Sequence, residues 1–168
     1  VIHHFIPRGW AEIALAAPDI DGFWADLLDL RDLFKFEFFF AGSDRFPQEV
    51  ANELTAEHPD WESEVAAGRG DQVILAPSVV GFAIAPLLEA YLVVADGLAA
   101  MEGGFDNGAV VAACLERGRL YRLEGRTESD ESVSASIYEG ALLLAENRGI
   151  IEGPNATAER QRLAEQVR

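Results

Sequence analysis

The sequence contains few of the residues on which common kinds of site depend. Its 168 residues include one cysteine, one methionine, one lysine and three histidines. A single cysteine excludes an internal disulfide framework and any zinc site built from several cysteines. The sequence also has no Gly-x-Ser-x-Gly segment and no phosphate-binding glycine loop. The motifs of serine hydrolases and of P-loop nucleotide-binding proteins are therefore missing.

Positive charge is scarce as well. The chain has 13 basic and 29 acidic residues, which gives a formal net charge of −16 at pH 7. Such an acidic chain disfavours broad electrostatic binding to nucleic acid or to anionic lipid. We therefore expect no nucleic-acid partner.

A start methionine is also missing, because the chain begins with Val1 and its only methionine is Met101. The first residues lack the charged stretch, apolar core and small-residue cleavage site of a signal peptide. We expect the chain to be a fragment whose N-terminal partner is not included.

The one long stretch without formal charge, residues 72–88, is a poor membrane span. A spanning helix needs about 20 apolar residues, and this stretch is interrupted by Pro77, Gly81 and Pro86. Two acidic residues, Glu89 and Asp96, follow in the same helical phase. We expect a buried core helix here, with an interfacial membrane segment as the alternative.

What the sequence does have is helical periodicity along most of its length. Phe23, Leu27, Leu30 and Phe34 recur at spacings of three and four and predict a helix through about Phe39. The pattern as a whole predicts an all-α fold, an irregular bundle of about six or seven helices. Residues 1–168 are expected to form a single region, with residues 154–168 as a loosely attached terminal helix.

Helix ends can be predicted from capping residues. Asp19 or Asp21, and later Asp106 or Asn107, can accept the free N–H groups of a first helical turn. A further helix is expected from Val133 to Arg148.

The few residues that could support metal or acid–base chemistry are poorly placed for it. His3 and His4 are adjacent, so on a helix their side chains point about 100° apart. His58 is distant in sequence, and we expect no metal and no cofactor. Glu89 and Asp96 share a helical face, where burial with an arginine partner is the favoured interpretation.

Two other chemical features also favour structural roles. Cys114 has apolar neighbours in sequence and no nearby histidine, so we expect a small buried side chain. Arg119, Arg122 and Arg126 lie three and four residues apart on one helical face. Pairing with carboxylates of the same chain is the preferred interpretation, and anion contact with a phosphate is the alternative. No catalytic residue is predicted.

Several segments, in order along the chain, carry a resemblance to a known family. Residues 27–40 read LLDLRDLFKFEFFF, and residues 86–96 read PLLEAYLVVAD. Further on come GRLY at 118–121, ESVS at 131–134 and ALLLAENRG at 141–149. These segments, with HHFIPR at 3–8, resemble the C-terminal part of the bacterial membrane-bound glycerol-3-phosphate acyltransferase family.

The resemblance implies a place within a longer enzyme. That family transfers an acyl chain from acyl-CoA or acyl-carrier protein to glycerol 3-phosphate, in phospholipid synthesis at the cytoplasmic face of the cell membrane. Its catalytic His-x4-Asp motif has no counterpart here, because the residues five positions after the three histidines are Arg8, Gly9 and Ser63. The family's catalytic residues therefore cannot be assigned to this chain.

The sequence differs from the family's motif near the arginines. The family tends to continue its Gly-Arg-x-Tyr segment with Gln-Arg-Arg, whereas this chain has Leu123, Glu124 and Gly125 between Arg122 and Arg126. The acidic Glu124 reduces the local positive charge and weakens the case for a phosphate contact.

Three hypotheses follow. The first is a non-catalytic C-terminal domain of such an acyltransferase, with the catalytic domain of the same parent chain as its partner and membrane contact only peripheral, through the parent protein. The second is an independent helical protein-interaction module. The third, which we disfavour, is a stand-alone metal or acid–base enzyme that uses His3, His4 or Glu89.

Overall fold

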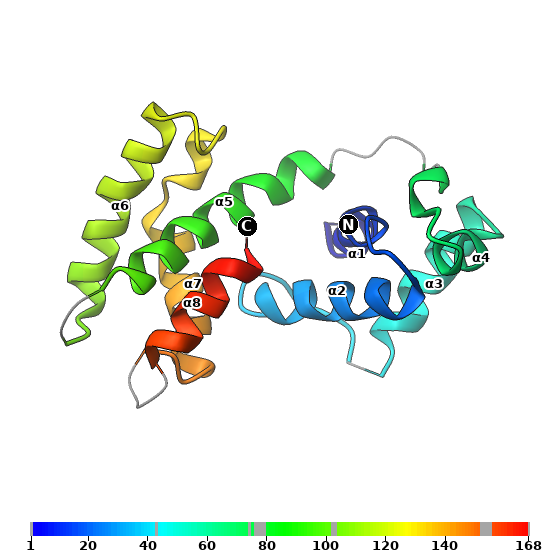
Figure 1. Ribbon diagram of the computed structural model, residues 1–168, viewed down its shortest axis with the longest axis horizontal. Helices are drawn as coiled ribbons and strands as arrows, with labels where there is room; N and C mark the ends of the chain where they lie inside the picture. Colours follow the sequence, from blue (N-terminus) through cyan, green and yellow to red (C-terminus); the bar gives the residue numbers. More distant parts are fainter. Residues whose placement is uncertain are drawn as a thin grey trace. The chain divides into compact units, whose positions relative to one another are not determined.

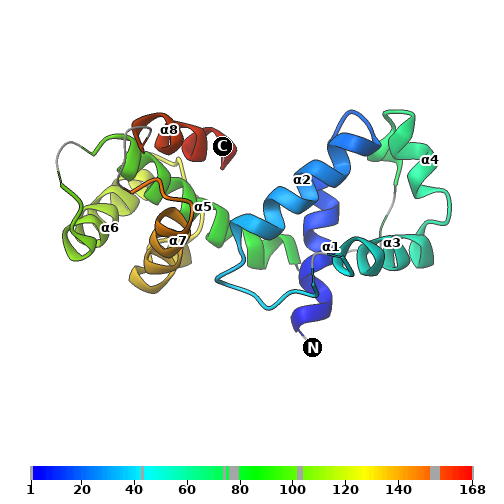
Figure 2. The same ribbon diagram turned by 90° about the horizontal axis from the view of Figure 1, so that it is seen from below.

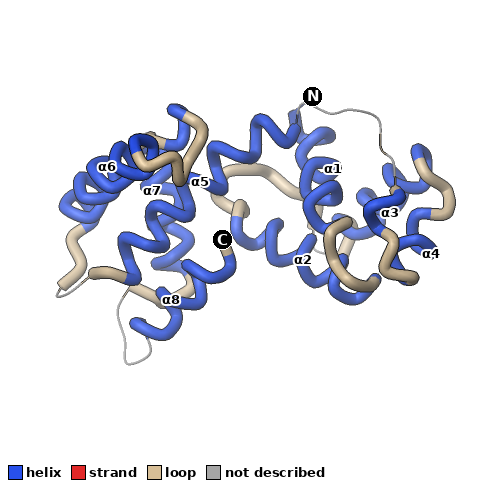
Figure 3. Tube along the Cα trace, turned by 45° about the horizontal axis from the view of Figure 1, so that its top comes forward, coloured by secondary structure: helices blue, strands red, loops and turns tan. Residues whose placement is uncertain are grey.

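The computed structural model describes residues 2–42, 44–73, 75, 80–101, 104–151 and 156–167. All regular structure in these ranges is helical, without a strand (Figure 3). The predicted all-α class is thus confirmed, with eight α-helices in the described residues where six or seven were expected. The chain divides into two compact units, Val1–Gly81 and Phe82–Arg168, a division that no linker in the sequence predicts.

The first unit is built around α1. Helix α1 contacts both α2 and α3, and α2 contacts α4 (Figure 2). The unit has these elements: α1 (Ile2–Ala14), α2 (Ile20–Leu33), α3 (Phe46–Glu57), α4 (Trp61–Ala66) and the short 3-10 helix η1 (Gly70–Gln72). Asp19 caps α2 as predicted, because its carboxylate accepts the N–H of Gly22 at 2.8 Å.

The core of this unit centres on Trp10, which is fully buried. Its ring contacts those of Phe34, Phe38, Phe40 and Phe46, at centroid distances between 4.7 and 6.3 Å. Aromatic pairs of this kind contribute about 0.5–1.5 kcal/mol each beyond the burial of their area. Phe34, Phe38 and Phe40 of the aromatic run therefore pack around Trp10, whereas Phe36 and Phe39 of the same run are exposed.

The expected helix through Phe39 is wrong, since α2 ends at Leu33 and Phe34 is its C-cap. The physical reason lies in the contacts with Trp10. On a continuing helix, Phe38 and Phe40 would point about 200° apart and could not both reach one ring. Leaving the helix allows both side chains to pack on Trp10.

The second unit contains the remaining helices (Figure 1). Its elements are α5 (Val80–Ala99), whose first two residues fall in the first unit, α6 (Asn107–Leu123), the 3-10 helix η2 (Asp130–Ser132), α7 (Ala135–Asn147) and α8 (Ala156–Gln166). Helices α6 and α7 lie side by side. Asp106 caps α6 as predicted, accepting the N–H of Ala109 at 2.7 Å.

The start of α7 differs from the prediction, whereas its end agrees. Residues 130–132 form η2 and Ser134 is extended, so α7 begins at Ala135 rather than at Val133. Arg148 is the C-cap of α7, and Gly149 follows it with φ +67°. A positive φ here favours glycine, and it ends the helix as the sequence predicts.

Helix α5 carries the apolar stretch into the second unit. Residues 74 and 76–79 of the uncharged stretch lie outside the described residues, and Pro86 is inside the helix. From Ile84 onward α5 buries a series of side chains that includes Ala90, Tyr91, Val93 and Val94. In the part of the chain that the structure describes, no helix has both the length and the hydropathy that crossing a membrane requires.

Helix α8 is anchored by an arginine. The guanidinium of Arg160, in a residue only 8% exposed, donates to the carbonyl oxygens of Ile150 and Ile151. Leu163 and Ala164 of the same helix are buried. These contacts fasten α8 to the segment before it, and the expected loose attachment of residues 154–168 stays a prediction about solution behaviour.

The packing of α6 against α7 depends on a glycine. A Cβ placed on Gly118 would overlap the hydroxyl of Tyr138, and it would lie 3.4 Å from a methyl group of Val133. The Tyr138 hydroxyl is buried without a hydrogen-bond partner among the described residues. Burial also raises the pKa of Tyr138 to about 12, so the phenol stays neutral and close to the backbone of α6.

This geometry predicts a reciprocal pair of substitutions. Gly118→Ala should lower the free energy of unfolding by about 1–3 kcal/mol through overpacking. Tyr138→Phe should be nearly neutral, because it removes an unpaired hydroxyl. In the Tyr138→Phe background, Gly118→Ala should no longer destabilise the chain, since alanine has the better helix propensity. Urea denaturation of the single and double variants measures these effects.

Gly108→Ala provides the control, because a Cβ on Gly108 meets only the Asp106 carboxylate, at 3.6 Å. A Gly118→Ala variant that unfolds at the same urea concentration as the wild type would contradict the packing described for α6 and α7.

Candidate functional site

The second unit contains a buried carboxylate, Asp96, which is 8% exposed and lies near the end of α5. One of its oxygens, Oδ2, accepts the hydroxyl of Tyr121 at 2.7 Å and the guanidinium of Arg126 at 3.2 Å. The guanidinium also lies over the ring of Tyr121, with its central carbon 3.6 Å from the ring centroid. Asp96, Tyr121 and Arg126 therefore form one contact group, here called the Asp96 cluster, which joins α5 to the end of α6.

A second carboxylate on α5 holds backbone rather than a side chain. Glu89 accepts the N–H of Glu128 on Oε1 at 2.6 Å and the N–H of Ser129 on Oε2 at 3.0 Å. Both N–H groups belong to the connection between α6 and α7. A carboxylate that accepts two backbone N–H groups acts as a helix cap does, through charge-assisted hydrogen bonds.

The connection between α6 and α7 is also held by a side chain of α6 and by a hydrogen bond within the connection itself. Arg122 donates to the carboxylate of Asp130 at 2.8 Å and to the carbonyl of Thr127 at 2.6 Å. Ser132, fully buried, donates its hydroxyl to the carbonyl of Ser129 at 2.7 Å. Residues 126–132 are thus held in place by both α5 and α6.

The predicted arginine face is occupied by partners from the chain itself. Arg119 pairs with Glu116, Arg122 with Asp130 and Arg126 with Asp96. This agrees with the preferred interpretation, pairing with internal carboxylates. Anion contact at Arg119, Arg122 and Arg126 remains an untested alternative, for which a phosphate would have to compete with these carboxylates.

The expectation for Glu89 and Asp96 was half right. Asp96 is buried and has an arginine partner, as predicted. For Glu89 the expected arginine is wrong, because its partners among the described residues are the N–H groups of Glu128 and Ser129. Sequence reasoning missed Tyr121 altogether, although its position in the Gly-Arg-Leu-Tyr segment was a signal that could have singled it out.

The other predicted candidates do not join this site. The side chains of His3 and His4 lie outside the described residues, and His58 is the C-cap of α3 in the first unit. The described residues contain no group of three or more His, Cys, Asp or Glu side chains that could hold a metal ion. Residues 82–168 include no histidine at all, so no imidazole of this unit can act as a base beside Asp96.

Cys114 is confirmed as a buried side chain, with 1% of its surface exposed. Burial raises the pKa of its thiol to about 11, more than the nearby positive charge of Arg117 lowers it. A thiol of this pKa is protonated at neutral pH and is a poor nucleophile. Chemically, then, the Asp96 cluster and its surroundings are suited to holding helices together.

The hydrogen bonds of Glu89 generate a prediction. Glu89→Gln leaves one acceptor oxygen and places an NH2 group against a backbone N–H, so the free energy of unfolding should fall by about 1–2 kcal/mol. Amide exchange at Glu128 and Ser129 should accelerate as well. Both quantities can be measured on the full chain by denaturation and by hydrogen exchange.

Glu128→Gln is the matched control, because it removes the same charge from an exposed side chain. If Glu128→Gln and Glu89→Gln change stability and exchange equally, the two backbone contacts of Glu89 do not hold the connection.

The chain is similar to known proteins over most of its length. A family model described as glycerol-3-phosphate acyltransferase C-terminal region matches residues 1–153. Proteins named "Putative acyltransferase plsB1", from Mycobacterium bovis and Mycobacterium tuberculosis, are 34% identical to the chain over 183 aligned positions. The alignment covers 99% of this chain and 30% of each relative. No solved structure matches the chain.

The residues of the Asp96 cluster and the Glu89 contacts all lie within the matched range. The chain spans less than a third of the length of the curated relatives that it matches. On the extent of the family match and the identity to these relatives, the chain belongs to the family of glycerol-3-phosphate acyltransferase C-terminal regions.

Proposed function

We propose that this chain is a non-catalytic helical domain that supports the catalytic domain of a glycerol-3-phosphate acyltransferase. The reaction is transfer of an acyl group from acyl-CoA or acyl-carrier protein to glycerol 3-phosphate, in phospholipid synthesis. The observation that carries the proposal is the family match to residues 1–153 in a chain without a His-x4-Asp motif.

The contacts of the second unit support this role. The carboxylates of Glu89 and Asp96 and the guanidinium groups of Arg122 and Arg126 are engaged by groups of the same chain. Groups that act on a substrate need to be available to it, whereas groups that stabilise a fold need partners within the fold. Their arrangement therefore favours support over chemistry.

Exposed apolar side chains favour a protein partner. Phe39 is 87% exposed in the first unit and Leu123 is 86% exposed at the end of α6. Single exposed apolar side chains are common at protein surfaces. The proposed partner here is the rest of the parent protein, because most of each relative lies outside the matched region. We propose that the catalytic domain covers some of these exposed side chains.

Membrane association is proposed to be peripheral, at the cytoplasmic face, and to depend on the rest of the enzyme. A net charge of −16 opposes approach to anionic lipid. The catalytic part would then have to supply the attraction to the bilayer.

An independent helical interaction module is the second candidate function. The observation in its favour is the exposure of Leu120 and Leu123, at 51% and 86%, on one end of α6. Expression of residues 1–168 alone distinguishes the two candidates. A cooperative, monomeric fold without affinity for the catalytic part favours the module, whereas aggregation or capture by the catalytic part favours the supporting domain.

A chimera tests the supporting role. This chain would replace the matched region of the Mycobacterium tuberculosis relative, and acyl transfer to glycerol 3-phosphate would be measured against the intact relative. We expect activity in the chimera, none in residues 1–168 alone, and none in the relative with the region deleted. Glu89→Gln in the chimera should lower the temperature of half-inactivation while leaving kcat and KM of the folded enzyme unchanged.

Glu128→Gln in the chimera is the matched control and should change none of these quantities. Acyl transfer by residues 1–168 alone, or full activity in the deleted relative, would contradict the proposal. A fall in kcat at every temperature in the Glu89→Gln chimera would instead assign this region to the chemical step.

A further inference from the structure

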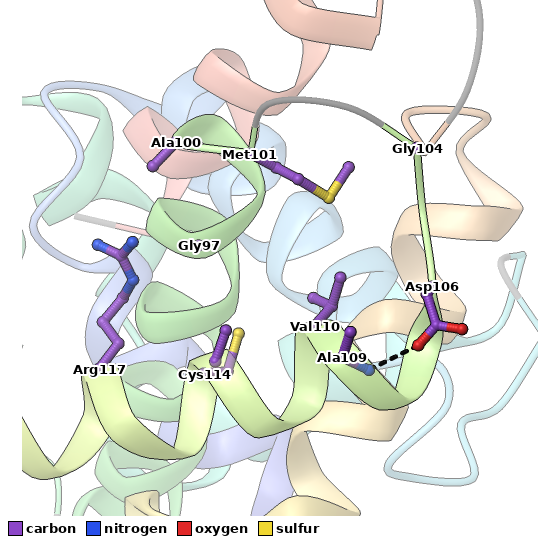
Figure 4. A pocket seen from close by; sticks show the side chains of 10 residues that line it. Gly97, Ala100, Met101, Gly104, Asp106, Ala109, Val110, Cys114 and Arg117 are labelled. Atoms are coloured by element: carbon purple, nitrogen blue, oxygen red, sulfur yellow. Dashed lines mark hydrogen bonds between the residues drawn. The ribbon is translucent and has the colours of Figure 1, made fainter.

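A cavity of about 280 Å³ lies between the end of α5 and the first half of α6 (Figure 4). Its wall is mostly apolar and formed largely by small side chains. The residues that matter for its character are Gly97, Ala100, Met101, Val110, Ala113 and Cys114. Ala100 and Ala113 are exposed, so the cavity reaches the surface of the second unit and a ligand can enter it.

The cavity owes part of its room to Gly97. A Cβ on this residue would lie 2.9 Å from the sulfur of Cys114 and 3.9 Å from Nε of Arg117. Glycine thus leaves the space in front of the thiol and the guanidinium open. At this end of the cavity the positively charged guanidinium of Arg117 therefore lies beside apolar lining residues.

Among the described residues that line the cavity, two carry a charge, Asp106 and Arg117, and they differ in their partners. The Asp106 carboxylate accepts the N–H of Ala109 and caps α6. Arg117, half-buried, makes no hydrogen bond and no ion pair within the described residues. This sets it apart from Arg119, Arg122 and Arg126, each of which pairs with a carboxylate.

The two charges are well separated. Asp106 and Arg117 are eleven residues apart, which corresponds to about 16 Å along the axis of a helix. Figure 4 shows them at opposite ends of the cavity, with Met101 and Val110 between them. An anionic group bound at Arg117 would therefore be far from the carboxylate that could repel it.

The volume sets the size of the ligand. An apolar cavity of about 150 Å³ binds a molecule as large as benzene, so 280 Å³ suits roughly ten non-hydrogen atoms. A chain of about eight carbons with a single-charged head group meets this limit. The apolar wall favours the carbons, and a guanidinium favours a carboxylate through a bidentate hydrogen bond.

We propose that this cavity is a binding site for an amphiphilic carboxylate with an unbranched chain of about eight carbons, the carboxyl carbon included. The carboxylate binds to Arg117, and the tail lies along Val110 and Met101. This site is separate from the Asp96 cluster, and the proposal does not depend on the proposed function.

Met101 supplies a direct readout, since it is the only methionine of the sequence. With methyl-13C methionine, its methyl group gives one NMR signal from the wall of the cavity, and Met101→Leu assigns that signal. Octanoate, added to about 10 mM to cover affinities in the millimolar range, should shift the signal in a saturable way. Acetate should not, because it lacks the tail.

Arg117→Gln should weaken octanoate binding at least tenfold, while binding of 1-octanol, which lacks the charge, should change less than twofold. Arg119→Gln is the matched control, because Arg119 lies on the same helix but outside the cavity wall, and it should leave octanoate binding unchanged. Arg117→Lys, which keeps the charge, should retain part of the affinity and guards against a folding defect in Arg117→Gln.

Three results would overturn the proposal. The first is a Met101 signal that does not shift when octanoate is added. The second is equal binding of octanoate and 1-octanol to the wild type. The third is an Arg117→Gln variant that folds normally and binds octanoate as tightly as the wild type does. The comparison of octanoate with 1-octanol needs no variant, so it decides the role of the charge even if Arg117→Gln fails to fold.

Discussion

The second unit depends on the compensation of one buried charge. Asp96 is 8% exposed, and removing a carboxylate from water costs several kcal/mol unless partners replace the lost hydration. Tyr121 provides that replacement from the last turn of α6, and Arg126 does so from two residues beyond the C-cap, Glu124. The position of α6 relative to α5 is therefore constrained by where these two side chains must meet the carboxylate.

The same constraint extends to the connection that follows. Arg126 begins the connection between α6 and α7, and the backbone of this connection is held by Glu89. Glu89 lies on α5, seven residues before Asp96. One face of α5 thus determines both where α6 ends and how the chain reaches α7. Of the segments that carry the family resemblance in this unit, residues 86–96 and 118–121 are joined directly by the contact of Tyr121 with Asp96. Residues 131–134 follow closely on the backbone that Glu89 holds. An internal network of this kind is what the proposed supporting role requires.

The sequence predicted those features whose cause is local. Asp19 and Asp106 cap their helices because a carboxylate needs only the N–H groups three residues ahead of it. Arg148 and Gly149 end α7 for an equally local reason. The all-α class followed from the same short-range periodicity.

Features that depend on distant residues were not predictable in this way. Phe38 and Phe40 leave the helix because Trp10, far earlier in the sequence, provides their packing surface. Ser129 is held by Glu89 across forty residues, and no pattern within either segment indicates that contact. At the Asp96 cluster, the arginine partner was foreseeable from charge balance. No charge pattern indicates Tyr121, because its hydroxyl is polar only at the tip of an otherwise apolar ring, and only its place in the Gly-Arg-Leu-Tyr segment points to it.

The measurement that tests this account most directly is a double-mutant cycle on Asp96 and Arg126, by urea denaturation of the full chain at low salt. Asp96→Asn keeps an acceptor for Tyr121 and removes the charge, and Arg126→Gln removes its partner. If the buried charge organises the second unit, the two effects will be coupled by about 1 kcal/mol or more. Additive effects within about 0.3 kcal/mol would show that Asp96 and Arg126 act independently, and the central claim would fail.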